Sequence, residues 1–433
     1  MTAARKAIVI GWDGATWDYV DPLLAAGRMP NLSRLLPDGV RFTLRSTIPP
    51  YTNVAWPSLV TGLNPLHTGI YDATSARHGS YEANPTNLTG HRGAPIWKWL
   101  NHLGLRCGVL NVPMTFPARP IDGYMVSGFD SVAQSPHVSY PRDILNEWRE
   151  RGYPYTILLE EIALMDSQNP HQERGELQEF VARWVNLTQY QGELVRRLWK
   201  EWPVDLLFVV FSGTDSINHR TNDRAMIELV YEAADEALGK ILQAVDDETF
   251  VCLLSDHGST PAHRYVSLYR ALHEAGWLRF RRQIATRYFQ RLPGRLGQAL
   301  PAVWRKLPSV AKHGLSLPLI RWDPRLVVAY DNIDWQQTSV YARTGMGALY
   351  INRRERRPQG NVTDEAYERF RDEVITFFEN LGDHQGNDIF SHVRRHEEVY
   401  EGTAPPGDDR PDIMLTPASW GDHLITGFHT VSY

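Results

Sequence analysis

Four short, uninterrupted apolar runs constrain the fold of this chain more than any other feature. They span residues 6–11, 106–111, 205–211 and 249–254. An apolar run without polar alternation is typical of a strand that is buried on both faces, as in a parallel sheet covered by helices. We therefore predict that these runs are strands of one mainly parallel sheet.

Helical patterns lie between and after these runs. Residues 222–246 begin with polar residues and then place apolar side chains three or four positions apart. Residues 363–381 show the same spacing after a Thr-Asp-Glu start. The alternation of strands and helices favours an α/β class. We predict a layered α/β/α core with a mostly parallel central sheet and cap insertions.

Two regions depart from this rhythm and are predicted to be insertions. Residues 76–200 are rich in Trp, Pro and Asn and show the strand–helix pattern only around 94–111. Residues 275–322 contain ten Arg or Lys and no acidic residue, which indicates a basic helical cap or a membrane-surface helix. We favour the cap. The catalytic core is then expected to comprise residues 1–75, 201–270 and 325–433.

The composition excludes several functional classes. The chain has 45 Lys and Arg against 50 Asp and Glu, and this net charge of −5 argues against binding to a nucleic acid duplex. The only two cysteines, Cys107 and Cys252, rule out a disulfide framework. No stretch reaches 18 apolar residues, and the first apolar run is too short for a signal peptide. We therefore expect a soluble, cytoplasmic protein.

The residues that follow three of the runs carry the strongest functional signal. They are Asp13 after the first run, Asp215 and His219 after the third, and Asp256 and His257 after the fourth. Ligands of open α/β sheets bind beyond the carboxyl ends of the strands, so these three strand ends are expected to converge. Clustered carboxylates need compensating cations, and Asp with neutral His is a normal ligand set for zinc or manganese.

A second signal is the Pro-Pro-Tyr-Thr segment that ends at Thr52. It leads into a short helical pattern closed by Gly62. A hydroxyl there would lie near a helix N-terminus, where backbone N–H groups and the helix dipole favour an anion. Taken alone, Thr52 is interpreted as a helix cap. It becomes a candidate nucleophile if the metal crevice activates its hydroxyl.

Several motifs occur in a characteristic order along most of the chain. They are Ile-Gly-Trp-Asp13-Gly, Met29-Pro-Asn-Leu, Pro-Pro-x-Thr52, Thr214-Asp215-x-x-x-His219, Ser255-Asp256-His257-Gly258, Ile333-Asp-Trp, Leu349-Tyr-Ile-Asn352 and Arg410-Pro-Asp-Ile413. In this order and spacing the chain resembles the type I phosphodiesterase/nucleotide pyrophosphatase family of the alkaline phosphatase superfamily. Within it, the phosphohydrolase/phosphomutase branch is the most similar. The resemblance implies an alkaline-phosphatase-like core.

The resemblance further implies a site for two divalent metal ions, with zinc favoured and manganese as the alternative. The ligands of the first ion would be Asp215, His219 and a late histidine, His429 or alternatively His423. The ligands of the second ion would be Asp13, Thr52, Asp256 and His257. Family members continue past the last histidine ligand, whereas this sequence ends at Tyr433. The expectation is therefore either a fragment or a loosely held first ion.

The implied reaction is the hydrolysis of a phosphate ester through a phosphothreonine intermediate. The Thr52 oxygen would attack phosphorus, and water would then hydrolyse the intermediate. The backbone N–H of Asn53 would stabilise a non-bridging oxygen. We expect a small phosphate ester or a nucleotide-type substrate, and we favour a diester.

Three other interpretations remain open or are set aside at this point. A sulfatase needs a Cys/Ser-x-Pro-x-Arg motif, which Cys107, Cys252 and Ser46 do not provide. A phosphomutase of the same superfamily would use the same phosphothreonine chemistry but return the phosphoryl group to its substrate. A non-catalytic, metal-stabilised binding protein would hold the ions without turnover.

Overall fold

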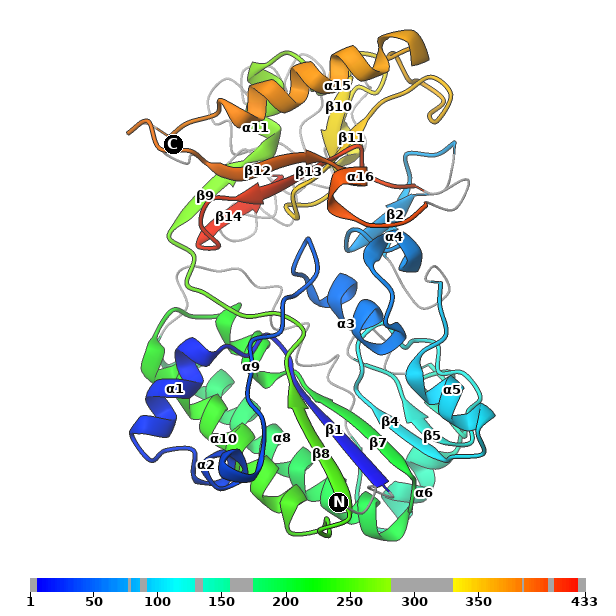
Figure 1. Ribbon diagram of the computed structural model, residues 1–433, viewed down its shortest axis with the longest axis vertical. Helices are drawn as coiled ribbons and strands as arrows, with labels where there is room; N and C mark the ends of the chain where they lie inside the picture. Colours follow the sequence, from blue (N-terminus) through cyan, green and yellow to red (C-terminus); the bar gives the residue numbers. More distant parts are fainter. Residues whose placement is uncertain are drawn as a thin grey trace, which may run out of the picture. The chain divides into compact units, whose positions relative to one another are not determined.

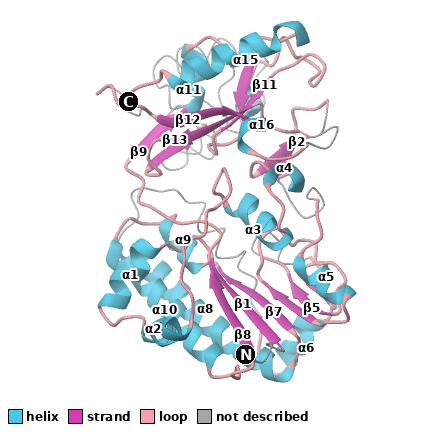
Figure 2. Ribbon diagram, in the orientation of Figure 1, coloured by secondary structure: helices cyan, strands magenta, loops and turns pink. Residues whose placement is uncertain are grey.

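The chain folds into two compact units. The computed structural model describes residues 6–76, 79–85, 92–128, 135–155, 174–281, 330–383, 385–403 and 409–426. Unit 1 comprises Met1–Ile70 and Thr86–Pro261, and unit 2 comprises Tyr71–Pro85 and Ala262–Tyr433. Each unit has its own sheet and its own helices (Figures 1 and 2).

A six-stranded sheet forms the centre of unit 1. Its strand order is β6-β5-β4-β7-β1-β8. The strands are β1 (Lys6–Trp12), β4 (Cys107–Leu110), β5 (Gly123–Val126), β6 (Ser139–Tyr140), β7 (Leu206–Phe211) and β8 (Thr249–Leu254). All neighbouring strands pair in parallel except β5 and β6. All four predicted strands are therefore present, and the mainly parallel sheet is confirmed.

Helices cover both faces of this sheet (Figure 1). The helices of unit 1 in the described ranges are α1 (Trp17–Ala25), α2 (Pro30–Leu35), α3 (Thr52–Thr61), α4 (Pro65–Thr68), α5 (Ile96–His102), α6 (Ile144–Glu150), α8 (Arg174–Glu201), α9 (Gly213–Asn218) and α10 (Arg224–Leu242), with a 3-10 turn η1 (Leu36–Asp38). The helix predicted at 222–246 is α10, with the apolar face buried as the spacing indicates.

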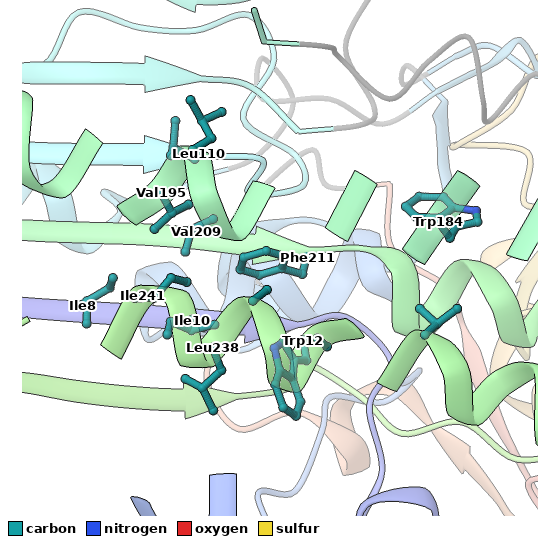
Figure 3. Close-up of a cluster of buried hydrophobic side chains, with 14 of the residues drawn as sticks. Ile8, Ile10, Trp12, Leu110, Trp184, Val195, Val209, Phe211, Leu238 and Ile241 are labelled. Atoms are coloured by element: carbon teal, nitrogen blue, oxygen red, sulfur yellow. The ribbon is translucent and has the colours of Figure 1, made fainter. Parts of the chain in front are cut away.

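The two faces of β1 and β7 are buried against different helices, which explains their uninterrupted apolar sequences. Ile8, Ile10 and Trp12 pack into one cluster with residues of α8 and α10 (Figure 3). On the opposite face, Phe208 of β7 lies edge-on to Trp56 of α3 and to Trp97 of α5. Because helices cover both faces of these two strands, apolar residues occupy both sides and polar alternation is absent.

The structure differs from the predicted division at residues 76–200. This range contributes β4, β5 and β6 to the sheet and α8 to one of its covering layers, so it is not simply an insertion. Strands of two to four residues are too short to show a period. Part of the second predicted insertion, residues 282–322, lies outside the described residues. Within the part of the chain that is described, no helix is both long and apolar enough to cross a membrane.

A buried carboxylate joins α10 to the start of α2. Asp235 accepts hydrogen bonds from the backbone N–H groups of Asn31 (3.0 Å) and Leu32 (2.7 Å), and from the Asn31 side chain (2.9 Å). The first N–H groups of a helix have no partner within it, and a carboxylate also complements the positive end of the helix dipole. Asp235 therefore fixes α2 on the α10 layer.

We expect Asp235→Ala to lower the free energy of unfolding by about 3 kcal/mol, because it leaves buried N–H donors without an acceptor. Urea denaturation measures this change. The neighbouring exposed residue provides the control, since Glu236→Ala should shift stability by no more than about 0.5 kcal/mol. Equal losses in the two variants would contradict the role given to Asp235.

The described residues of unit 2 form three small sheets. A four-stranded antiparallel sheet has the order β10-β11-β13-β12, β14 pairs in parallel with β9, and β2 pairs with β3. The strands are β2 (Thr74–Ala76), β3 (Ala83–Pro85), β9 (Arg264–Ser267), β10 (Val340–Ala342), β11 (Ala348–Ile351), β12 (Phe390–Arg395), β13 (Ile413–Pro417) and β14 (Asp422–Ile425). The helical elements are α11 (Leu268–Glu274), η3 (Tyr330–Asn332), α15 (Asp364–Glu379) and α16 (His396–Val399). Helix α15 confirms the prediction at 363–381.

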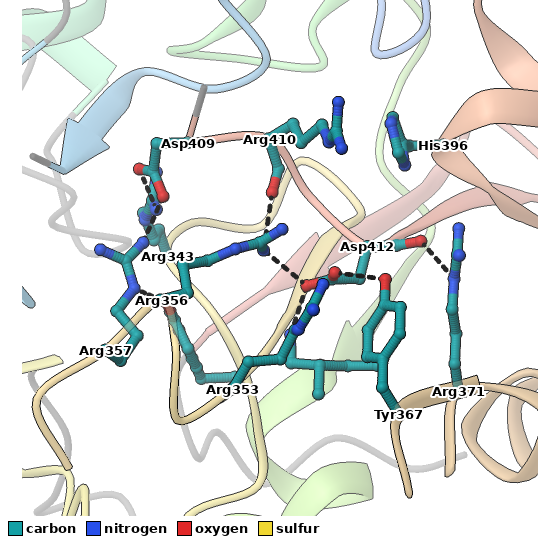
Figure 4. A network of polar contacts seen from close by, with 12 residues as sticks. Arg343, Arg353, Arg356, Arg357, Tyr367, Arg371, His396, Asp409, Arg410 and Asp412 are labelled. Atoms are coloured by element: carbon teal, nitrogen blue, oxygen red, sulfur yellow. Dashed lines mark hydrogen bonds and ion pairs between the residues drawn. The ribbon is translucent and has the colours of Figure 1, made fainter. Parts of the chain in front are cut away.

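A polar network holds the four-stranded sheet of unit 2 to α15 (Figure 4). Buried Asp412 accepts from the N–H of Ile351 (2.7 Å), from Arg356 (3.0 Å) and from the Tyr367 hydroxyl (2.7 Å). The side-chain amide of buried Asn352 donates to backbone carbonyl oxygens within the same unit. The motifs at 349–352 and 410–413 therefore stabilise this unit.

Candidate active site

Four elements of unit 1 carry the predicted site residues that the structure describes. Asp13 follows β1, and Asp256 and His257 follow β8. Asp215 lies in α9, the short helix that follows β7, and His219 comes directly after this helix. Strands β7, β1 and β8 are adjacent and parallel, so their carboxyl ends lie at the same edge of the sheet (Figure 1). Thr52 is the first residue of α3.

These residues converge on one small volume. The Thr52 hydroxyl oxygen lies 2.9 Å from Nε2 of His257 and 3.4 Å from Oδ1 of Asp13. Nε2 of His257 is 3.6 Å from Oδ1 of Asp13 and 3.6 Å from Oδ2 of Asp256. One ligand atom from each of Asp13, Asp215 and His257 lies within 4.8 Å of the others. These distances agree with the expectation from the sequence that the three strand ends converge.

Asp215 and His219 form a pair on the short helix α9. Nε2 of His219 lies 3.1 Å from Oδ2 of Asp215, as expected for side chains four residues apart on a helical turn. The His219 side chain is 63% exposed, whereas that of Asp215 is 17% exposed. The pair therefore presents a nitrogen ligand and a carboxylate at the solvent side of the acidic cluster.

Glycines allow the close approaches in this site. Gly14 has a φ of +64°, and a Cβ at this position would lie 2.7 Å from Oδ1 of Asp215. A Cβ on Gly11 would lie 2.3 Å from the Trp56 ring. The absence of both side chains brings α9 and α3 onto the turn that carries Asp13.

The His257 ring has a defined tautomer when it is neutral. Nδ1 lies 2.9 Å from the carbonyl oxygen of Gly258, so Nδ1 carries the proton and donates it to that carbonyl. Nε2 then presents its lone pair toward Thr52, Asp13 and Asp256. This is the orientation of a histidine whose second nitrogen is fixed for metal binding.

The electrostatics of the cluster are unfavourable without a cation. Burial raises the pKa of Asp13 well above its usual value, and the charges of Asp256 and Asp215 raise it further. Burial also raises the pKa of Asp256, although the charge of His257 opposes this. For Asp215, burial again acts upward, but attraction to His219 outweighs it and lowers the pKa.

The two histidines respond to the same negative field. The charge of Asp215 and its hydrogen bond raise the pKa of His219 to about 9. Burial would lower the pKa of His257, but the charges of Asp256 and Asp215 outweigh burial and raise it. Both rings are therefore placed where a positive charge is stabilised.

The donor set fits a divalent cation. Oδ1 of Asp256 accepts from the N–H of Gly14 (3.2 Å), whereas its buried Oδ2 receives no hydrogen bond from any described residue. A buried carboxylate oxygen without a donor is costly unless a cation neutralises it. Carboxylate oxygen with imidazole nitrogen is the ligand chemistry of zinc and manganese.

The sequence analysis missed the residues that hold Asp13 in place. The Trp56 indole N–H donates to Oδ2 of Asp13 (3.4 Å), and the Thr214 hydroxyl donates to its carbonyl oxygen (2.6 Å). Ser255 accepts from the N–H of Ala15 (2.9 Å). Thr214 and Ser255 belong to the quoted motifs, so their neighbourhood was visible in the sequence, but these contacts depend on the folded turn.

The third ligand of the first ion stays a prediction. His429 lies outside the described residues. His423 lies in β14 of unit 2, where its ring packs edge-on against Tyr265. Asn53 occupies the second position of α3, beside Thr52.

Solved structures show the same architecture. Phosphonoacetate hydrolase from Sinorhizobium meliloti 1021, in complex with phosphonoacetate, aligns with a TM-score of 0.55 and 17% identity over 99% of this chain and 84% of that one. The wild-type alkaline phosphatase PafA aligns with a TM-score of 0.54 and 12% identity over 96% and 85% of the two chains. These likenesses show that the chain has an alkaline-phosphatase-like fold.

The sequence comparison identifies the family. Residues 7–430 match the family model of type I phosphodiesterase/nucleotide pyrophosphatase. The chain therefore belongs to this family, and it is a phosphoester hydrolase rather than a non-catalytic binding protein. No curated protein matches the sequence. The resemblance and the fold class stated from the motifs are both confirmed.

Proposed function

We propose that this hydrolase is a metal-dependent, phosphodiesterase/nucleotide pyrophosphatase-like enzyme that uses Thr52 as its nucleophile. The carrying observation is the position of the Thr52 hydroxyl, which is buried at the start of α3, 2.9 Å from Nε2 of His257 and 3.4 Å from Oδ1 of Asp13. A threonine that only capped the helix would not need an imidazole and a carboxylate beside its oxygen.

The surroundings of Thr52 support in-line attack on phosphorus. Nε2 of His257 and Oδ1 of Asp13 lie beside its hydroxyl and orient the oxygen. The single hydroxyl proton is released as the Thr52 oxygen attacks, and it balances the proton that the leaving oxygen takes up. Bond formation from the Thr52 oxygen to phosphorus breaks the bond to the leaving oxygen, which departs as an alcohol or phenol after protonation. Water then cleaves the phosphothreonine and regenerates the Thr52 hydroxyl. The N–H of Asn53, in the first turn of α3, would bind a phosphoryl oxygen.

The chain's own residues account for the proposed metal sites. Asp13, Asp256, His257 and Thr52 would hold one ion, and Asp215 and His219 would hold the other together with His429 or His423. When bound, the ions lower the pKa of the nucleophilic hydroxyl and neutralise the charge on the phosphoryl group. We favour zinc because the ligands are Asp and His, with manganese as the alternative.

Metal removal tests this proposal. We expect chelated protein to hydrolyse bis(nitrophenyl) phosphate at least about 1,000-fold more slowly than protein reloaded with zinc. The same assay with nitrophenyl phosphate and phosphonoacetate compares ester classes, and we expect the diester to be preferred. Unchanged turnover in protein shown by elemental analysis to be metal-free would contradict metal dependence.

The phosphomutase interpretation has a distinct signature in such an assay. A hydrolase releases the alcohol and leaves a phosphate product in solution, with oxygen from water incorporated into it. A mutase returns the phosphoryl group to the substrate and incorporates no oxygen from labelled water. We expect incorporation of labelled oxygen, measured by mass spectrometry of the phosphate product.

A further inference from the structure

The segment between η1 and α3 carries a row of exposed apolar side chains. Val40 is 91% exposed, Phe42 is 71% exposed and Leu44 is 55% exposed. They occupy every second position of the sequence Val-Arg-Phe-Thr-Leu-Arg at residues 40–45. Three large apolar groups at alternating positions of one segment form a continuous surface, whereas single exposed apolar residues need no explanation.

One of the intervening side chains, Arg41, is anchored on unit 1. Arg41 stacks on the Trp17 ring of α1 at 3.7 Å and pairs with Asp21 at 2.7 Å. Arg41 is therefore anchored on α1, whereas Val40, Phe42 and Leu44 are exposed to solvent.

The backbone of the segment is also free to pair. Gly39 enters it with extended geometry (φ −114°, ψ −179°). Across the described ranges, no hydrogen bond involves the backbone groups of residues 40–45. A segment whose N–H and C=O groups are unpaired and whose apolar side chains are exposed can serve as a template for pairing with another strand.

We propose that residues 40–45 form an antiparallel strand pair with the same segment of a second copy of this chain. The sequence pattern is self-complementary when the two-fold axis passes through Phe42. Val40 then lies opposite Leu44 of the other copy, Phe42 lies opposite itself, and Arg41 lies opposite Thr43. Such an isologous pair closes on itself as a dimer.

The arginines select this register over its neighbours. An axis through residue 41 would place Arg41 opposite Arg41, and an axis through residue 43 would place Arg41 opposite Arg45. Like charges directly opposite each other destabilise an antiparallel pair. A register shifted by one residue would instead bring apolar side chains opposite polar ones. The axis through Phe42 avoids both costs, which is the argument for a second copy as the occupant.

Analytical ultracentrifugation of the full chain tests the dimer. A pair of six-residue strands is smaller than a standard interface, so we expect a Kd on the order of micromolar. Between about 1 and 100 µM the wild type should pass from monomer to dimer. Phe42→Arg should raise the Kd at least about tenfold, because it places two arginines opposite each other at the axis.

Leu229→Arg is the matched control, since Leu229 on α10 of unit 1 is also exposed (41%) and no other apolar side chain of comparable exposure lies near it in the sequence. Its Kd should equal that of the wild type. A wild type that stays monomeric at about 100 µM, or a Phe42→Arg variant that dimerises like the wild type, would overturn the proposal. Thermal melts of both variants establish that they are folded.

Cysteine cross-linking tests the register. Opposite Cα atoms in an antiparallel pair lie about 4.5–5.5 Å apart, which is within the range of a disulfide. Phe42→Cys should therefore form a cross-linked dimer under mild oxidation, and Val40→Cys alone should not. The double variant Val40→Cys/Leu44→Cys should cross-link again. The wild type gives the background from Cys107 and Cys252, and equal cross-linking of Val40→Cys and Phe42→Cys would overturn the assigned register.

Discussion

Thr52→Ala is expected to reduce hydrolysis of bis(nitrophenyl) phosphate by at least about 1,000-fold while the protein stays folded and keeps most of its metal. The variant removes the oxygen that forms the covalent bond to phosphorus, whereas Asp13, Asp256 and His257 remain as ligands. Thr52→Ser should keep measurable activity, because it preserves a hydroxyl at the start of α3. Initial rates and metal content are measured on the same preparations.

Thr61→Ala is the control for this variant. Thr61 is the last residue of the same helix, and its hydroxyl donates to the Pro57 carbonyl (2.6 Å), away from the acidic cluster. We expect its activity to stay within about twofold of the wild type at a temperature where the variant is folded. If Thr52→Ala retained activity within tenfold of the wild type, direct attack by water would replace the covalent route.

The second large effect is expected from Asp256→Asn, which should separate stability from function. In the metal-free protein, burial raises the pKa values of Asp13 and Asp256, and the charge of Asp256 raises the pKa of Asp13 further. The amide of an asparagine at position 256 removes one negative charge. Its NH2 group can also replace the buried Oδ2 atom, which accepts no hydrogen bond from a described residue. We expect the metal-free variant to be more stable than the metal-free wild type by about 1–3 kcal/mol, yet to gain little stability from zinc and to lose activity.

The pH dependence of this difference follows from the direction of the pKa shifts. A carboxyl group whose pKa is raised on folding binds protons more tightly in the folded state. The metal-free wild type should therefore lose stability as the pH rises from about 4, the unfolded value, through the raised folded values. The advantage of Asp256→Asn should accordingly grow between about pH 4 and pH 7, as measured by urea denaturation in the presence of a chelator.

Asp247→Asn provides the matched control, because Asp247 is exposed beyond the end of α10. It should show neither a gain in metal-free stability nor a loss of zinc binding. A metal-free Asp256→Asn variant less stable than the wild type would show that the carboxylate cluster is not under electrostatic strain.

The strands that the sequence predicts for the right reason are those covered on both faces. Strands β4 and β7 are buried throughout, and β1 lies between β7 and β8, so their apolar runs reflect burial. Strand β8 is also predicted correctly, but it is an edge strand whose Phe250 is 57% exposed, so burial on both faces does not explain its apolar run. Helix α8 escaped prediction because its buried Trp184, Leu194 and Leu198 are spread among many charged residues over 28 positions. The strands of unit 2 are mostly three to six residues long and give no periodic signal.

Some contacts of the candidate site could likewise be predicted from the sequence, and others could not. The four-residue spacing of Asp215 and His219 predicts their contact, because a helical turn places them on one face. The proximity of Thr52 to His257 depends on residues 205 positions apart, and only the family resemblance indicated it. The role of Trp56 could not be predicted, because its approach to Asp13 requires the space that Gly11 leaves open in the folded chain.

The most direct test of the account is the mass of the peptide that carries Thr52, isolated after acid quenching of the zinc-loaded enzyme during turnover of bis(nitrophenyl) phosphate. We predict that Thr52 carries the phosphoryl group with its remaining nitrophenyl ester, and that this adduct forms in step with the first release of nitrophenol. Release of nitrophenol in a burst while Thr52 stays unmodified, or an adduct on another residue, would contradict a threonine nucleophile.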